Sequence, residues 1–151
     1  MARSNPEAVR LFVNPHCHYG AGLSRWEKVK DEIQRRMPIV ETHEILSPEE
    51  IVSEVSRAVK NGERRFIAGG GDGTVNLLLN AIMNLSDAPD VAIGAVGLGS
   101  SNDFHKPFRP EAFINGIAAR IDFRSAFRCD VIRIDYRDIG GCWRTRFCLI
   151  N

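Results

Sequence analysis

The chain lacks several features that mark common classes of protein. Its four cysteines form no C-x-x-C pair, so no zinc or thiol redox motif is present and no disulfide framework is expected. No apolar run approaches the length that crosses a bilayer, and residues 1–8 contain no apolar segment typical of a secretory signal. The formal net charge of only +1 gives no reason to expect nucleic acid as a partner. Together these absences predict a cytoplasmic protein.

The size and composition indicate a folded domain. With 151 residues the chain is long enough for one domain with a hydrophobic core and too short for two of ordinary size. Hydrophobic residues make up 44% and charged residues 26% of the chain, an ordinary mixture that argues against disorder.

Strand-like and helix-like patterns alternate through the first hundred residues. Strands are expected at 9–13, 41–46, 65–68 and 91–96, and helices at 24–37, 48–62 and 73–85. Two of the helices begin with signatures of a capping box, at residues 24–27 and 47–50. This alternation predicts an α/β fold, with a layered, Rossmann-like parallel sheet and flanking helices.

The pattern changes after Arg120. Residues 131–134 and 144–151 resemble strands, and the turn between them at 138–141 leaves no room for a crossover helix, so a hairpin is expected. The last of these strands is apolar up to Asn151, so we expect either that the sequence is a fragment or that this strand needs partners that the chain does not supply.

The most informative segment is Gly-Gly-Gly-Asp-Gly-Thr at residues 69–74, between a strand-like and a helix-like stretch. A strand that turns into a helix through glycines directs backbone N–H groups and the positive end of the helix dipole at one point, which suits a phosphate. The glycines also remove the Cβ atoms that would keep a ligand away from the backbone. The segment lacks the P-loop lysine, and Thr74 stands where a dinucleotide fingerprint has its third glycine. We therefore predict a phosphorylated ligand held by a different kind of loop.

Asp72 is unusual among amides that bind phosphate. A bare carboxylate would repel a triphosphate, and a hydrated Mg²⁺ ion is the obvious counter-charge. The alternative is a tight turn in which Asp72 only caps the helix.

A second polar loop, residues 97–104, follows the fourth expected strand. Parallel strands have their carboxyl ends at one edge of the sheet, so this loop should bring Ser100, Asn102 and Asp103 close to Asp72. Two such loops would suit a magnesium–nucleotide complex. The alternative is a flexible surface loop with an Asn-Asp turn.

Together these segments resemble the catalytic-domain family of diacylglycerol kinases, which includes bacterial lipid kinases and sphingosine and ceramide kinases. That family has Asn-Pro after the first strand, Gly-Gly-Asp-Gly-Thr-x-Asn after the third, and Gly-Thr-x-Asn-Asp-Phe after the fourth. The corresponding segments here are Asn14-Pro15, Gly70 to Asn76 and Gly99 to Phe104. Ser100 replaces the threonine of the last motif but keeps its hydroxyl, and Gly97 stands where proline is usual.

The resemblance implies an ATP- and Mg²⁺-dependent lipid kinase that transfers the γ-phosphate to a lipid hydroxyl. It implies catalytic roles for Asp72 and Asp103, and a metal-and-water network formed by Asp72, Asp103 and Asp130. It also implies a nucleotide site lined by Asn14, Pro15, His16, Cys17, His18, Ser47, Gly70, Gly71, Asp72, Gly73, Thr74, Val75, Asn76 and Ser100. A capping role would equally explain Ser47.

The resemblance further divides the chain into two parts. Residues 1–121 would form the α/β nucleotide-binding lobe, and residues 122–151 would open a second, β-rich domain that supplies the general base. We therefore expect this chain alone to transfer no phosphate, although the kinase would meet its lipid substrate peripherally at a membrane surface. The open edge of the hairpin could also recruit a second copy to form a homodimer.

Two other functions stay open at this point. An NAD kinase-like or phosphofructokinase-like enzyme would share the Gly-Gly-Asp-Gly segment, although the Asn-Asp-Phe loop favours the lipid group. A non-catalytic nucleotide-binding module would fit the missing base and Leu77, which stands where the family often has glutamate.

Overall fold

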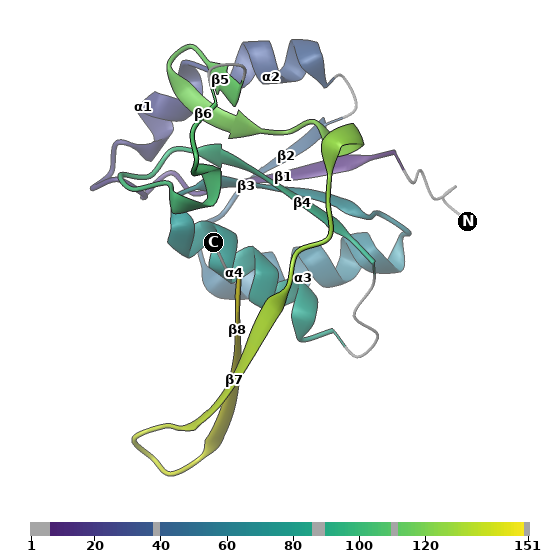
Figure 1. Ribbon diagram of the computed structural model, residues 1–151, viewed down its shortest axis with the longest axis vertical. Coiled ribbons are helices and arrows are strands. Elements are labelled where there is room, and N and C mark those ends of the chain that lie inside the picture. The colour runs from purple at the N-terminus through teal and green to yellow at the C-terminus, as the bar shows by residue number, and fades with distance from the viewer. Residues whose placement is uncertain (1–6, 38–39, 86–89, 110–111, 150–151) are drawn as a thin grey trace.

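The computed structural model describes residues 7–37, 40–85, 90–109 and 112–149 (Figure 1). Its strands are β1 (Val9–Val13), β2 (Val40–Glu44), β3 (Arg65–Gly70), β4 (Ala92–Gly97), β5 (Phe113–Ile114), β6 (Ile117–Arg120), β7 (Val131–Arg137) and β8 (Trp143–Leu149). Its helices are α1 (Gly22–Glu27), α2 (Lys30–Arg36), α3 (Pro48–Lys60) and α4 (Asp72–Met83), with short 3₁₀ turns η1 (Asp103–His105) and η3 (Phe123–Ser125).

The centre of the fold is a six-stranded sheet in the order β2-β1-β3-β4-β6-β5. Strands β1 to β4 are parallel, whereas β6 pairs antiparallel with β4, and β5 with β6. The hairpin β7-β8 forms a separate two-stranded sheet that projects away from the rest (Figure 1). The predicted α/β class, with a mostly parallel sheet followed by antiparallel strands, is therefore confirmed.

Helices cover both faces of the sheet (Figure 1). In β1, the buried side chains of Val9, Leu11 and Val13 join the cluster that includes Trp26 of α1, and Phe12 joins the cluster on the opposite face. This alternation follows from the two-residue period of a strand. One hydrophobic core thus lies under α1 and α2, and a second lies under α3 and α4.

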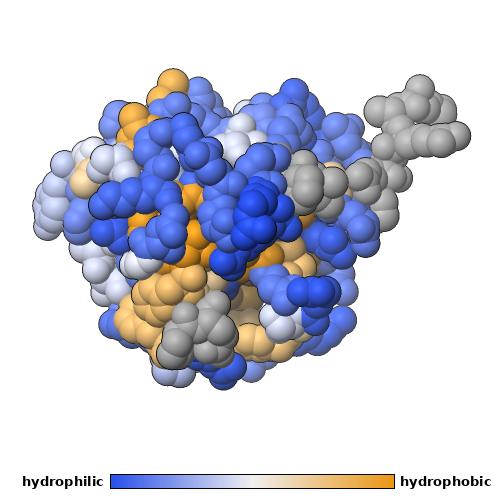
Figure 2. Space-filling view, turned by 90° about the horizontal axis from the view of Figure 1, so that it is seen from above, coloured by the Kyte–Doolittle hydropathy of each residue, from blue (hydrophilic) through white to orange (hydrophobic). Residues whose placement is uncertain are grey.

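The surface is largely hydrophilic in the view from above, with apolar side chains visible between the polar ones (Figure 2). Within the described part of the chain, no helix combines the length and apolar character needed to cross a bilayer.

Of the two predicted capping boxes, one is present and one is not. The Ser47 hydroxyl accepts from the Glu50 N–H at 3.3 Å, and the Glu50 carboxylate accepts from the Ser47 N–H at 3.3 Å. The box predicted at Ser24 is wrong, because α1 begins at Gly22 and Ser24 lies inside it, where its hydroxyl donates to the Ala21 carbonyl. A Cβ on Gly22 would lie 2.6 Å from the Cys17 sulfur, so the preceding loop packs closely against the start of the helix.

The helix expected over residues 24–37 is two helices. It breaks at Lys28 and Val29, where Val29 has a φ of −121° and a fully buried side chain. Burial of a β-branched side chain in this kink is a tertiary effect that outweighs the helical periodicity.

The chain between β4 and β7 contains two strands that the sequence analysis did not anticipate. Strands β5 and β6 are short and are joined by Asn115 and Gly116, both with positive φ. Asn-Gly is the preferred pair for this kind of tight hairpin turn, so the signal was present in the sequence.

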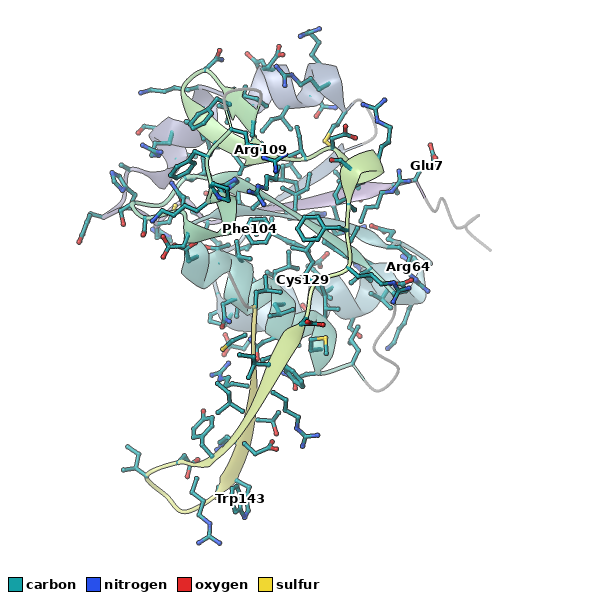
Figure 3. The ribbon with its side chains drawn as sticks, viewed as in Figure 1. Glu7, Arg64, Phe104, Arg109, Cys129 and Trp143 are labelled. Carbon is teal, nitrogen blue, oxygen red and sulfur yellow. The ribbon has the colours of Figure 1, made fainter. Side chains whose placement is uncertain are left out.

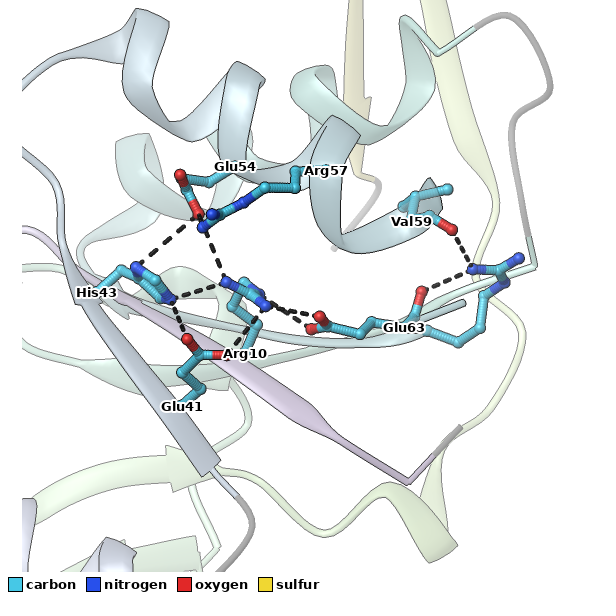
Figure 4. Close-up of polar contacts among 8 residues, drawn as sticks. Arg10, Glu41, His43, Glu54, Arg57, Val59 and Glu63 are labelled. Carbon is cyan, nitrogen blue, oxygen red and sulfur yellow. Dashed lines mark hydrogen bonds and ion pairs between the residues drawn. The ribbon is translucent and has the colours of Figure 1, made fainter. Parts of the chain in front are cut away.

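A buried arginine ties β1 to the elements beside it (Figure 4). Arg10 donates to the Glu63 carboxylate at 2.9 and 2.6 Å, and its guanidinium also lies 3.0 Å from Glu41 and 3.4 Å from Glu54. Its remaining close neighbour is the His43 ring at 2.8 Å. The hydrogen bonds to Glu63 raise the pKa of Arg10 against the opposing effect of burial. A buried cation needs such compensation, and the cluster fastens β1 to β2, α3 and the start of β3.

The hairpin β7-β8 is attached to the rest of the described structure through helix α4. The buried Asn80 side chain accepts from the Phe147 N–H at 3.0 Å and donates to the Phe147 carbonyl at 2.9 Å. Asn76 donates to the same carbonyl at 3.0 Å. The side chains of Asn76 and Asn80 therefore form hydrogen bonds with the backbone of β8, as a neighbouring strand would. Trp143 lies near the turn at the far end of the hairpin (Figure 3).

We predict that Asn80→Ala lowers the free energy of unfolding by about 1–3 kcal/mol, because it leaves the half-buried Phe147 N–H without its partner and removes one of the two amide donors to the Phe147 carbonyl. Urea denaturation followed by circular dichroism measures this change. Asn84→Ala is the matched control, since Asn84 ends the same helix but is exposed. Equal stability of the two variants would contradict the attachment through Asn80.

Candidate functional site

The predicted site residues lie mainly where three parallel strands end. Strands β1, β3 and β4 are neighbours, and each leads at its carboxyl end into a polar loop (Figure 1). We call residues 14–21 the first loop, residues 70–74 the glycine loop and residues 97–104 the second loop. Ligands of open parallel sheets bind at this edge.

The glycine loop and the second loop are in direct backbone contact. A Cβ on Gly99 would lie 2.4 Å from the Cα of Gly71, and the Leu98 N–H donates to the Gly70 carbonyl at 2.9 Å. A side chain at Gly99 would push the two loops apart. The structure thus brings the two segments together, as the sequence predicted.

The glycines of the glycine loop have different roles. A Cβ on Gly70 would lie 2.2 Å from the hydroxyl oxygen of Thr74, so Gly70 is needed for the strand to pass into α4. A Cβ on Gly73 would meet no atom within 4 Å. The fold therefore requires Gly70, and it leaves open space beside Gly73 at the first turn of the helix.

The first loop is bonded to the glycine loop through Asn14. Its side-chain amide donates to the Thr74 hydroxyl at 3.2 Å, and its carbonyl oxygen accepts from the His16 N–H at 3.0 Å. Thr74 is buried, so this contact lies beneath the surface of the site. Asn14 and Thr74 accordingly set the relative position of the two loops.

Asp72 links the glycine loop to the second loop. One oxygen of its carboxylate accepts from the Phe104 N–H at 3.0 Å, and the other has no partner among the described residues. His105 and Lys106 are close enough to Asp72 for its negative charge to favour their protonated forms, and it acts to raise the pKa of both. Asp72 is thus a half-buried carboxylate, fixed through one oxygen, at the N-terminus of a 12-residue helix.

Asp103 and Asp130 do not join Asp72 in a cluster. Asp103 is exposed and accepts from the Ser101 hydroxyl at 2.9 Å and from the Lys106 ammonium at 2.6 Å, and the bond to Lys106 lowers the pKa of its carboxyl. Asp130 is exposed immediately before β7, and no contact joins its carboxylate to either of the others. Across the described ranges, no three histidine, cysteine, aspartate or glutamate side chains gather as a ready metal site.

Several other predicted residues already have roles in the fold. The Ser47 hydroxyl caps α3, and the Asn76 amide holds β8. Val75 and Pro15 are buried, whereas Ser100 is exposed on the second loop.

The remaining predicted residues form the bend of the first loop. His16 is exposed and His18 is half-buried with a φ of +54°, followed by Tyr19 at +55°. Burial raises the pKa of the Cys17 thiol, against the opposing charge of Arg25. Two successive non-glycine residues in the left-handed region indicate backbone strain at this edge of the site.

Sequence reasoning did not predict the surroundings of Asn102, in the second loop, and of His105, just after it. Asn102 has a φ of +55° and donates to the carbonyls of Gly97 at 3.2 Å and Gly99 at 3.0 Å, so it holds the loop in its bend. The Asn-Asp pair was a signal for this turn. His105 is 3% exposed and its Nδ1 atom has no partner in the described structure, which nothing in the sequence indicated.

His105 predicts a pH dependence of stability. Burial lowers its pKa to about 4, with the charge of Arg120 acting in the same direction. The unfolded chain gains a proton on this histidine below about pH 6.5, while the folded state does not until about pH 4. The unfolded state therefore binds more protons between these values, and the stability falls as the pH falls through that window.

We expect His105→Gln to reduce the slope of unfolding free energy against pH between 4 and 6.5, by up to about 1.4 kcal/mol per pH unit. Urea titrations of both proteins at half-unit pH intervals measure the two slopes, and above pH 7 the slopes should agree. Identical slopes across the whole range would show that His105 is protonated equally in both states.

Comparisons with known proteins identify the family. The model of the diacylglycerol kinase catalytic domain matches residues 8–134. "Probable lipid kinase YegS" of Escherichia coli is 34% identical over 98 residues, which cover 64% of this chain and 29% of that protein. "Probable lipid kinase YegS-like" of Chromohalobacter salexigens is 49% identical over 47 residues, which cover 31% of this chain and 15% of that protein. The chain thus spans less than a third of the length of these relatives. It belongs to the diacylglycerol kinase catalytic-domain family.

Proposed function

We propose that this chain is the nucleotide-binding lobe of a lipid kinase that uses ATP and Mg²⁺. The observation that carries the proposal is the joint formed by the glycine loop and the second loop at the carboxyl edge of the sheet. Gly71 and Gly99 touch there, and Asp72 is bonded across the joint to Phe104. In a family of kinases, an edge with backbone amides and one fixed carboxylate fits a metal-bound nucleotide.

The phosphates would lie against the N-terminus of α4. The first N–H groups of a helix have no partner within the helix, and the helix dipole adds positive potential there. The space beside Gly73 would let a phosphate approach the backbone. Val75, whose side chain is buried, could contribute only its backbone.

The donor set fits magnesium with Asp72 as its carboxylate. Mg²⁺ retains several waters and uses one or two carboxylates together with the phosphates, so a single aspartate is sufficient. The free oxygen of Asp72 is the available protein ligand. When bound, the ion would neutralise charge on the transferred phosphoryl group. Asp103 and Asp130 remain predicted members of this metal-and-water network. To join it, Asp103 would have to give up its ion pair with Lys106.

The other residues of the site would act by positioning. Phosphoryl transfer depends on alignment and charge stabilisation more than on covalent chemistry by the protein. The Phe104 N–H holds the Asp72 carboxylate, and Asn14 holds Thr74, so the first turn of α4 is fixed before a nucleotide binds. Of the other predicted contacts, Ser100 and His16 have exposed side chains available to a ligand.

The lipid acceptor is supported by the family and by the relatives' names. Both relatives described above are named as lipid kinases, and the chain shares their family. We propose a lipid hydroxyl as the acceptor, met at a membrane surface, and a general base in the part of such enzymes that this chain does not span. Homodimerisation through the hairpin remains a prediction.

We predict that Gly73→Ala weakens Mg-ATP binding about tenfold or more without loss of stability. The added methyl group would occupy the space that a phosphate needs, and an interaction of 1–3 kcal/mol corresponds to about 5- to 150-fold in affinity. Stability should hold because the methyl meets no neighbour and alanine favours a helix. Isothermal calorimetry with Mg-ATP measures the affinity.

Gly140→Ala provides the control, because Gly140 lies in the turn of the hairpin and its added Cβ would make only an ordinary contact with Asp138 at 3.4 Å. This variant should bind Mg-ATP like the unchanged chain. If Gly73→Ala also binds like the unchanged chain, the glycine loop is a turn and not a phosphate site.

A further inference from the structure

Arg25 occupies a distinctive position between two of the site's loops. It extends from α1, which follows the first loop, and its Nη2 atom donates to the Gly97 carbonyl at 3.1 Å, where β4 ends. Gly97 is paired in register with Gly70, from which the glycine loop departs. The guanidinium therefore lies beside the joint of the glycine loop and the second loop, on the side of the sheet covered by α1.

The charge of Arg25 has no counter-ion among the described residues. Over the described residues, no carboxylate lies within 4.0 Å of its guanidinium, and its Nε atom is buried with no acceptor. By contrast, the buried Arg10 is surrounded by three carboxylates. A half-buried cation that meets only a carbonyl is costly, because the loss of hydration is not offset by an opposite charge.

The electrostatic reach of Arg25 extends to the first loop as well. Its charge opposes the rise that burial produces in the pKa of the Cys17 thiol. Arg25 thus acts on the first loop, which follows β1, and donates to the carbonyl at the end of β4. Strand β3, which leads into the glycine loop, lies between β1 and β4 in the sheet. An anion bound over the strand ends would meet an arginine that is already positioned and unneutralised.

We propose that Arg25 is a phosphate-binding residue of this site, whose guanidinium contacts a phosphate of the nucleotide bound at the glycine loop. This inference rests on the function proposed above and adds to it a residue outside the motifs that characterise the site. Arginine suits the role because its planar donors match phosphate oxygens and its charge persists at all relevant pH values. The bond to Gly97 would keep the guanidinium in place between binding events.

The test compares Arg25→Gln with Arg64→Gln in the 151-residue chain. Arg64 is a matched control because it is half-buried and, among the described residues, also donates only to carbonyls, those of Val59 at 3.0 Å and Glu63 at 2.8 Å. It precedes β3 and so lies at the opposite edge of the sheet (Figure 3). Calorimetry with Mg-ATP, adenosine and inorganic tripolyphosphate gives the affinities, and thermal melts without ligand give the stabilities.

We expect Arg25→Gln to bind Mg-ATP about 10- to 100-fold more weakly, as the loss of a charge-assisted hydrogen bond implies, and to bind adenosine unchanged. Its melting temperature without ligand should not fall, because the substitution removes an unpaired charge. Arg64→Gln should bind Mg-ATP like the unchanged chain.

The remaining outcomes separate the two proposals. If both variants bind Mg-ATP like the unchanged chain, or if Arg25→Gln loses stability and keeps its affinity, Arg25 is structural and only this inference fails. Binding of tripolyphosphate that depends on Arg25, without binding of ATP, would retain the residue's role and overturn the nucleotide-binding proposal. If the unchanged chain binds neither compound, both proposals are wrong.

Discussion

The candidate site depends on the contact between the backbones of Gly71 and Gly99. A Cβ on Gly99 would lie only 2.4 Å from the Cα of Gly71, so this approach is possible only without a side chain at Gly99. It aligns the ends of β3 and β4, and it lets the Phe104 N–H reach the Asp72 carboxylate. Without the contact, the helix N-terminus and the second loop would not form one surface. The glycines are therefore required first by the packing of the loops and then by any ligand.

The charges around this joint are arranged unevenly. Most of the exposed ion pairs join residues that are close in the sequence, such as Glu32 with Arg35 and Arg36. At the joint, Asp72 has one free oxygen and Arg25 has no carboxylate partner in the described structure. Opposite charges left unpaired on two sides of one joint are what a metal–phosphate complex would satisfy, since it presents both a cation and anionic oxygens.

Much of the fold follows from local patterns in the sequence. The apolar run at 9–13 and the Ser47 capping box correspond to β1 and the start of α3, because each signal acts over a few residues. The glycine loop was located because strand, glycines and helix follow one another directly. The family resemblance, based on three motifs, is confirmed by the match to residues 8–134.

The rest depends on contacts between distant residues, which periodicity does not report. The kink at Val29 depends on burial, and the roles of Asn76 and Asn80 depend on a strand about seventy residues away. Asp103 carries the same side chain as Asp72, yet it is bonded to Lys106 on the surface. The motif identified both aspartates, and only the three-dimensional arrangement distinguishes their surroundings.

The central claim is that a metal-bound nucleotide occupies the joint of the two loops. Titration of the ¹⁵N-labelled chain with Mg-ATP, followed by amide chemical shifts, tests it residue by residue. The account predicts that the largest changes fall in residues 70–74 and 97–104, with smaller ones in 14–18, and that the turn of the hairpin at 138–141 does not respond. Changes concentrated elsewhere, for example between β2 and α3 around His43 and Glu54, or no saturable change at all, would contradict it.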